Sequence, residues 1–241
     1  MIVAAAFLPN PPLLVPAVAS GASAELEPLR QACRIALRRV NDSGATRLAL
    51  VGSGDTSAMH SPVARGSLSG YGVSLDVHLG SPACGGAVEL PLALTVGAWL
   101  VADALGPSSG AVGFSVGPDF AASRAAVGLL ALAESTPVGL IVMGDGSARR
   151  STTAPGYLDP RAEPFDTGVE TALATGDIDA LAALDSRLGA ELLAFGVPAW
   201  HAAAAVLSGR YTAELLYADA PYGVGYFAAA WTAQTAQTAR A

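Results

Sequence analysis

The chain has 241 residues, of which 52% are hydrophobic and only 14% are charged, so it is too apolar for a disordered protein and long enough for a large α/β domain. Its net charge of −7 argues against nucleic-acid binding, which requires a basic surface. All 13 residues counted as lysine or arginine are arginines. The absence of lysine excludes Schiff-base, pyridoxal-phosphate and P-loop chemistry, because each needs an ε-amine.

The cysteines and the apolar segments bear on the cellular compartment. Cys33 and Cys84 make neither a disulfide framework nor a zinc site, so we expect reduced thiols in a cytoplasmic protein. The longest apolar stretch, about Ala83–Ala102, is interrupted by Glu89 and Pro91, and no membrane span is predicted. The N-terminus is apolar but contains prolines and lacks a basic segment, so no signal peptide is expected.

Short apolar runs alternate with segments of helical periodicity along the chain. In chain order, strands are expected at Ile2–Phe7, Arg47–Gly52, Val73–His78, Ala111–Val116, Val138–Met143, Tyr211–Tyr217 and Gly223–Trp231. Helices are expected at Ser23–Val40, Leu90–Ala104, Asp119–Ala133, Asp177–Leu193 and Pro198–Leu207. The Pro-, Thr- and Gly-rich segment Ser151–Asp166 is predicted to be a loop, and Asp219–Tyr222 a turn.

This order of elements predicts the architecture. The first five strands are almost continuously hydrophobic, which is typical of strands buried on both faces of a parallel sheet. We therefore expect a three-layer α/β sandwich with a central, mainly parallel sheet and helices on both faces. No linker separates two units, so residues 1–232 are predicted to form a single domain, followed by a tail at 233–241.

One motif predicts nucleophilic catalysis. The segment Gly113–Gly117 fits the G-x-S-x-G pattern of α/β-hydrolases, with Ser115 as the nucleophile. Asp145 and His201 follow in the chain order that such a catalytic triad requires. The alternative interpretation is that Ser115 is an ordinary residue inside a strand. The histidines show no metal-binding spacing, and His78, in an apolar strand, is expected in the core.

Polar residues directly after the predicted strands indicate a ligand crevice. Asn10, Asp55 and Asp145 each follow a strand, and in parallel sheets such positions lie at one edge, where ligands bind. The further candidates near these strand ends are His60, Ser147, Arg149 and Arg150. The arginines favour an anionic ligand, since guanidinium groups bind carboxylates and phosphates through paired donors. The alternative is that these are turn residues and solvated loops.

Three segments, in this order, resemble the class III extradiol dioxygenase catalytic-subunit (LigB-like) superfamily, which includes the MEMO-type proteins. They are MIVAAAFLPNPPLLVP at the start, GDGSARRSTTAPGYLDPRAEPFD at 144–166, and Phe195–Trp200. The second segment is the most specific, and the resemblance spans nearly the whole chain. It implies a three-layer α/β fold, an Fe(II) ion held by two histidines and a carboxylate, and oxidative opening of a catechol ring.

At the positions that the resemblance assigns to chemistry, this chain carries other residues. The family's first histidine ligand falls on Asn10 and its second on Asp55, whereas the carboxylate ligand falls on Phe195-Gly196. The catalytic histidine that follows the serine in the family is Ala148 here. Facial-triad iron needs three good ligands, so the sequence predicts that this Fe(II) site has been lost.

Two hypotheses for function follow. In the first, a divergent LigB-like protein without a cofactor binds a small, possibly anionic molecule or a protein partner in the crevice. In the second, it is an extradiol-dioxygenase-like enzyme with a rearranged site, in which Asp55, His60 and Asp145 hold another divalent metal ion. Ser115 hydrolase chemistry ranks third. We expect neither nucleic acid nor membrane as a partner, and a homo-oligomer is compatible with the sequence.

Overall fold

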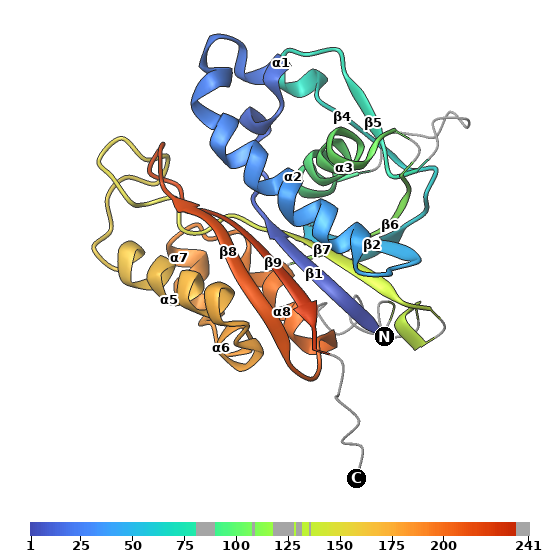
Figure 1. The fold of residues 1–241 in the computed structure, drawn as a ribbon. Helices are drawn as coiled ribbons and strands as arrows, with labels where there is room; N and C mark the ends of the chain where they lie inside the picture. Colours follow the sequence, from blue (N-terminus) through green and yellow to red (C-terminus); the bar gives the residue numbers. More distant parts are fainter. Residues whose placement is uncertain (81–89, 108, 118–127, 129–131, 135, 235–241) are drawn as a thin grey trace.

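The computed structural model describes residues 1–80, 90–107, 109–117, 128, 132–134 and 136–234. Its central feature is a seven-stranded sheet with the strand order β3-β6-β2-β7-β1-β9-β8 (Figure 1). The strands are β1 (Ile2–Leu8), β2 (Arg47–Ser53), β3 (Ala58–His60), β6 (Ala111–Val116), β7 (Val138–Met143), β8 (Tyr211–Asp219) and β9 (Tyr226–Ala233). Six of these strands are confirmed where they were expected, with ends that differ by at most a few residues, whereas β3 was not predicted.

The sheet is parallel at its centre and antiparallel at its edges. β6, β2, β7 and β1 run parallel to one another, whereas β9 pairs antiparallel with β1, β8 with β9, and β3 with β6. The expected mainly parallel sheet is therefore present as a four-stranded core. Among the antiparallel strands, β9 follows β8 and β3 follows β2 through short loops, so neither connection includes a crossover helix.

The predicted strand Val73–His78 lies outside the central sheet. Only its second half is a strand, β5 (Asp76–His78), and it pairs with β4 (Arg65–Ser67) in a separate two-stranded sheet. Within β5, Val77 is buried while its neighbours are more exposed, which is the alternation of a strand with one buried face. His78 follows Val77 and points to the other face of the strand, where its side chain is half-buried. The expectation that His78 lies in the core is therefore wrong.

Helices flank both faces of the central sheet. They are α1 (Pro16–Ala19), α2 (Glu27–Asp42), α3 (Leu92–Leu105), α5 (Ala162–Thr175), α6 (Ile178–Ala182), α7 (Ser186–Glu191) and α8 (Val197–Val206), with 3-10 turns at Pro12–Leu14, Ser20–Leu26 and Ser69–Tyr71. Figure 1 shows α2 and α3 on one side of the sheet, and α5 to α8 on the other. The core is divided accordingly into two hydrophobic clusters, one on each face.

Alternate residues of β1 supply both clusters. Ala5 and Phe7 pack on the side of α5 and α8, while Ala4, Ala6 and Leu8 pack on the side of α2 and α3. This explains why β1 is apolar throughout.

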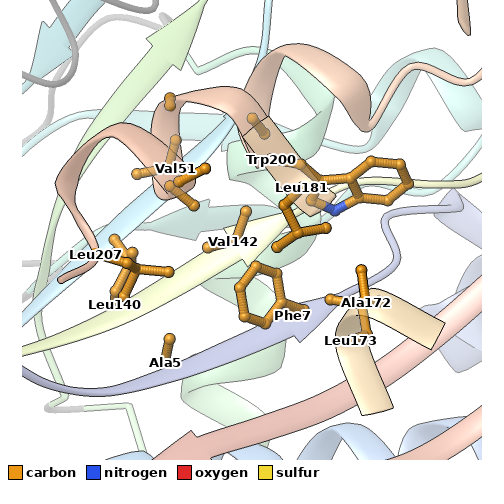
Figure 2. Close-up of a cluster of buried hydrophobic side chains, with 14 of the residues drawn as sticks. Ala5, Phe7, Val51, Leu140, Val142, Ala172, Leu173, Leu181, Trp200 and Leu207 are labelled. Atoms are coloured by element: carbon orange, nitrogen blue, oxygen red, sulfur yellow. The ribbon is translucent and has the colours of Figure 1, made fainter. Parts of the chain in front are cut away.

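Aromatic side chains fill the layer between the sheet and α5 to α8. The rings of Phe7 and Trp231 lie 4.6 Å apart, and the indole N–H of Trp231 donates to the carbonyl of Leu173 at 2.8 Å. Figure 2 shows Phe7 beside Val142 and close to Leu173 and Trp200. A buried indole needs an acceptor for its N–H, and the end of α5 provides it here.

Three predicted elements differ from the structure or cannot be compared with it. The loop expected at Ser151–Asp166 ends early, because α5 already begins at Ala162. The single helix expected at Asp177–Leu193 is two short helices, α6 and α7, since Asp185 caps a new helix within it. Most of the helix expected at Asp119–Ala133 lies outside the described residues, as do Cys84 and residues 235–241 of the predicted tail.

Among the described helices, none combines the length and the hydropathy that crossing a membrane would require.

The break between α6 and α7 is open to a direct test. The Asp185 carboxylate accepts hydrogen bonds from the backbone N–H groups of Arg187 and Leu188. We expect Asp185→Ala to lower the free energy of unfolding by about 1 kcal/mol, as the loss of an N-cap does. Urea denaturation measures this, with Glu170→Ala on the exposed face of α5 as the control. A stabilising effect of Asp185→Ala would instead indicate one continuous helix, in which alanine is favoured.

Candidate functional site

The carboxyl ends of the four parallel strands gather most of the predicted site residues. Asn10 follows β1, Asp145 follows β7 and Asp55 follows β2, and these three strands are neighbours in the sheet. The chain continues from β1 to α2 on one face of the sheet, whereas it continues from β7 to α5 on the other face. Where connections diverge in this way, an open α/β sheet has its ligand crevice.

Asn10 and Asp145 lie in direct contact. The backbone N–H of Asn10 donates to Oδ1 of Asp145 at 2.8 Å and joins the segment after β1 to the segment after β7. The Asp145 side chain retains some solvent contact, but protein atoms crowd it. This burial raises the pKa of the carboxyl to about 7, although the Asn10 N–H lowers it. The charge of Asp145 also adds to the effect of burial in raising the pKa of Tyr226.

The position expected for the family's carboxylate ligand has no space for a side chain. A Cβ at Gly196 would lie 2.6 Å from Cζ2 of Trp200 and 2.7 Å from the carbonyl oxygen of Asp145. The same backbone lies against β7, since a Cβ at Gly144 would be 2.5 Å from Cα of Gly196. Gly196 also donates its N–H to the Asp145 carbonyl at 2.9 Å, which fixes this approach.

These residues do not fit a two-histidine, one-carboxylate iron centre. Asn10 contributes an amide, Gly196 contributes no side chain, and Asp55 lies with a different set of neighbours. Within the part of the chain that is described, no three His, Cys, Asp or Glu side chains gather closely enough to hold a metal ion. We therefore derive no chemical step through iron at these positions.

Ser147 belongs to a buried network centred on Asp166. One carboxylate oxygen of Asp166 accepts the Ser147 backbone N–H at 2.8 Å, and the other accepts the Ser147 hydroxyl at 2.7 Å and an N–H of Arg150 at 3.3 Å. Burial raises the pKa of the Asp166 carboxyl, while these donors lower it. Cβ atoms at Gly146 and Gly225 would lie within 2.7 Å of the carboxylate oxygens, so glycine is required around it.

The two arginines are engaged within the protein. Arg150 pairs with Asp166 and, more weakly, with the exposed Glu163. An N–H of the Arg149 guanidinium donates to the carbonyl of Gly156, and its Nε is buried with no hydrogen-bond partner among the described residues. An anionic ligand held by these arginines would therefore depend on Arg149 alone, and the Gly156 carbonyl already occupies part of its donor capacity.

A separate hollow of about 280 Å³ lies beside the loop that connects β2 to β3. It is lined by Gly54, Asp55, Thr56, His60, Leu90, Pro91 and Ser115. Its residues come from the ends of β2 and β6, from β3 and from the start of α3. The described lining includes Asp55 and His60 but not Asn10 or Asp145, so the predicted residues fall into two groups.

His60 and Ser115 meet in this hollow. Nε2 of His60 lies 3.0 Å from the Ser115 hydroxyl, which also donates to the Thr56 carbonyl at 2.8 Å. His201, the base expected for a Ser115 hydrolase, instead places Nε2 3.0 Å from the carbonyl of Leu184. The sequence did not reveal the contact of His60 with Ser115, because it depends on the antiparallel pairing of β3 with β6.

Comparison with known proteins extends to the fold alone. No protein-family model and no curated protein matches the sequence. The structure is similar to the crystal structure of the uncharacterized protein JW3007 from Escherichia coli K12, with a TM-score of 0.56 and 15% sequence identity. The match covers 95% of this chain and 99% of that one, so the two share an architecture over their whole length.

The close approach at Gly196 predicts a large effect of a small substitution. We expect Gly196→Ala to lower the free energy of unfolding by about 1–3 kcal/mol, because the new methyl group overlaps the buried Trp200 ring. Gly168→Ala is the matched control. No atom lies within 4 Å of its added Cβ in α5, and alanine there should stabilise the helix by up to about 1 kcal/mol. Equal effects in urea denaturation would contradict the packing described.

The buried Asp145 carboxyl predicts a pH dependence of stability. Its folded-state pKa of about 7 exceeds the ordinary value of 3.8, so the folded protein holds the proton more tightly than the unfolded chain does. Stability is therefore lost as the pH rises from about 4 to about 7. The variant Asp145→Asn carries no titrating group at this position. Relative to it, the free energy of unfolding of the wild type should fall by roughly 2 to 4 kcal/mol over this pH range. Parallel stability curves for the two proteins would contradict this, as would a ¹³C NMR titration of the carboxyl with a midpoint below pH 5.

Proposed function

We propose that this chain is a divergent member of the LigB-like extradiol dioxygenase superfamily that binds a small molecule and carries no facial-triad iron. The observation that carries the proposal is the hollow of about 280 Å³ at the carboxyl ends of β2 and β6. Small-molecule sites are concave and combine polar groups with apolar side chains, and this hollow combines Asp55, Thr56, His60 and Ser115 with Leu90 and Pro91. The family's three-layer fold would place this site at the edge where its members bind substrate.

Two features support membership of the superfamily. The helices on both faces of the sheet agree with the fold that the resemblance implies. The most specific resembling segment, residues 144–166, has a structural role here. It contains Ser147, Arg150 and Asp166, which hold one another in the buried network. A motif kept for such packing can persist after the metal ligands have been replaced. The proposed compartment is the cytoplasm, where the buried Cys33 would remain a thiol.

A second candidate function is serine hydrolysis, which the 3.0 Å contact between His60 and Ser115 favours. A nucleophilic serine must give its proton to the histidine, but the Thr56 carbonyl competes for that proton at 2.8 Å. Binding therefore ranks ahead of hydrolysis. Covalent labelling of Ser115 by a phosphonate ester, absent in His60→Gln, would reverse this order.

Gly54 offers a test of binding in the hollow. A Cβ at Gly54 would lie 3.1 Å from Cβ of Ser115 and 3.3 Å from Pro91, so Gly54→Ala narrows the hollow between these two side chains. The probe is benzyl alcohol, a neutral molecule of suitable size, titrated while ¹H–¹⁵N NMR spectra are recorded. We expect saturable shifts at the amides of Thr56, His60 and Ser115, and binding several-fold weaker in Gly54→Ala.

Gly70→Ala is the matched control, because an added Cβ there meets no atom within 4 Å. It should bind the probe as the wild type does. Absence of saturable shifts around the hollow in the wild type, with benzyl alcohol and also with charged molecules of the same shape, would refute the proposed function.

A further inference from the structure

The charges around the hollow select among ligands. Among the described lining residues, Asp55 is the only carboxylate and none is an arginine. We propose that the ligand is a small primary amine with an apolar group, whose ammonium pairs with the Asp55 carboxylate. This inference rests on the proposed function and assigns the ligand class that the hollow would accept. It replaces Arg149 and Arg150 by Asp55 as the charge that recognises the ligand.

Asp55 differs from the other carboxylates at this edge of the sheet. Asp145 accepts an N–H from Asn10, and Asp166 accepts three hydrogen bonds from Ser147 and Arg150. The side chain of Asp55 is exposed, and within the described residues no donor reaches its oxygens. An ionised carboxylate has about four acceptor positions, so Asp55 keeps its capacity for a charged donor.

The neighbouring groups suit an ammonium ion better than an anion. The Ser115 hydroxyl gives its proton to the Thr56 carbonyl, and a carbonyl oxygen can accept a second hydrogen bond. Asp55 and Thr56 thus offer acceptors to an ammonium group, which has three donors. A carboxylate or phosphate ligand would be repelled by Asp55. The protein's net charge of −7 also raises the local concentration of cations over anions.

The N-terminus of α3 exerts the opposite influence. The helix begins after Pro91, and the partial positive charge of its first turn favours anions. This charge amounts to about half an elementary charge, whereas the Asp55 carboxylate carries a full one. The balance at the hollow remains negative, and the helix end weakens the preference for a cation without reversing it.

The apolar wall and the volume limit the rest of the ligand. Leu90 and Pro91 form the apolar part of the lining, against which a ring or alkyl group can pack. The volume of about 280 Å³ lies just below the roughly 300–1,000 Å³ typical of ligand pockets. A compact amine of the size of benzylamine is accordingly the matching class.

Three molecules of one shape separate the charge effect from the shape effect. Benzylamine, benzyl alcohol and benzoate are titrated into the wild type at neutral pH, and the dissociation constants are obtained from the amide shifts around the hollow. We expect benzylamine to bind about tenfold more tightly than benzyl alcohol, as one charge-assisted pair allows, and benzoate to bind most weakly. Asp55→Asn should remove the tenfold advantage and leave benzyl alcohol unchanged.

Glu170→Gln is the matched control, since it removes one negative charge from the exposed face of α5, away from the hollow. It should keep the preference for benzylamine. Benzoate binding as tightly as benzylamine would overturn the inference, and so would a preference for benzylamine that survives in Asp55→Asn. In both cases binding itself, and with it the proposed function, would stand. Failure of all three molecules to bind would refute the proposed function and the inference together.

Discussion

The contact between Gly144 and Gly196 is the constraint on which the arrangement of this edge depends. It brings the backbone after β7 against the start of α8 at a distance that only glycine allows on both sides. The Gly196 N–H bonded to the Asp145 carbonyl then fixes the orientation of the segment after β7. As a result the Asp145 carboxyl turns to Asn10, and the space beside α8 is filled by backbone and by Trp200. Open space for a ligand remains farther along the sheet, beside β2 and β6.

Under the proposed assignment to the LigB-like superfamily, the Asp166 network explains how the segment 144–166 can persist after the associated chemistry is lost. Its carboxylate joins the loop after β7, the start of β9 and helix α5, because Ser147, Arg150 and two close glycines surround it. Removing one member would leave a buried charge or donor without its partner, at a cost of several kcal/mol. The side chains of Asn10 and Asp55 lie outside this network, and they can change while the loop after β7 keeps its conformation.

The sequence predicted the parallel strands of the central sheet and the helices α2 and α3 well. β6 and β7 begin and end where the apolar runs Ala111–Val116 and Val138–Met143 do, since strands buried on both faces leave a continuous signal. Short helices were harder to locate. The N-cap Asp185 lies within a stretch whose apolar spacing fitted one longer helix. Helix α5 begins within a segment whose prolines and glycines suggested a loop. Local propensity does not show where a cap or a buried carboxylate such as Asp166 overrides it.

The interior position of β1 in the sheet has a consequence for the order in which the chain can fold. Ala5 pairs with Leu140 on one side and with Trp231 on the other, so the first strand is completed by segments from the second half and from the last strand of the protein. During synthesis the N-terminal segment can pack against α2, but both of its partner strands are made only later. Non-local pairing of this kind is slow, because loop closure precedes any gain from contact. The sheet can therefore be completed only after nearly the whole chain has been made.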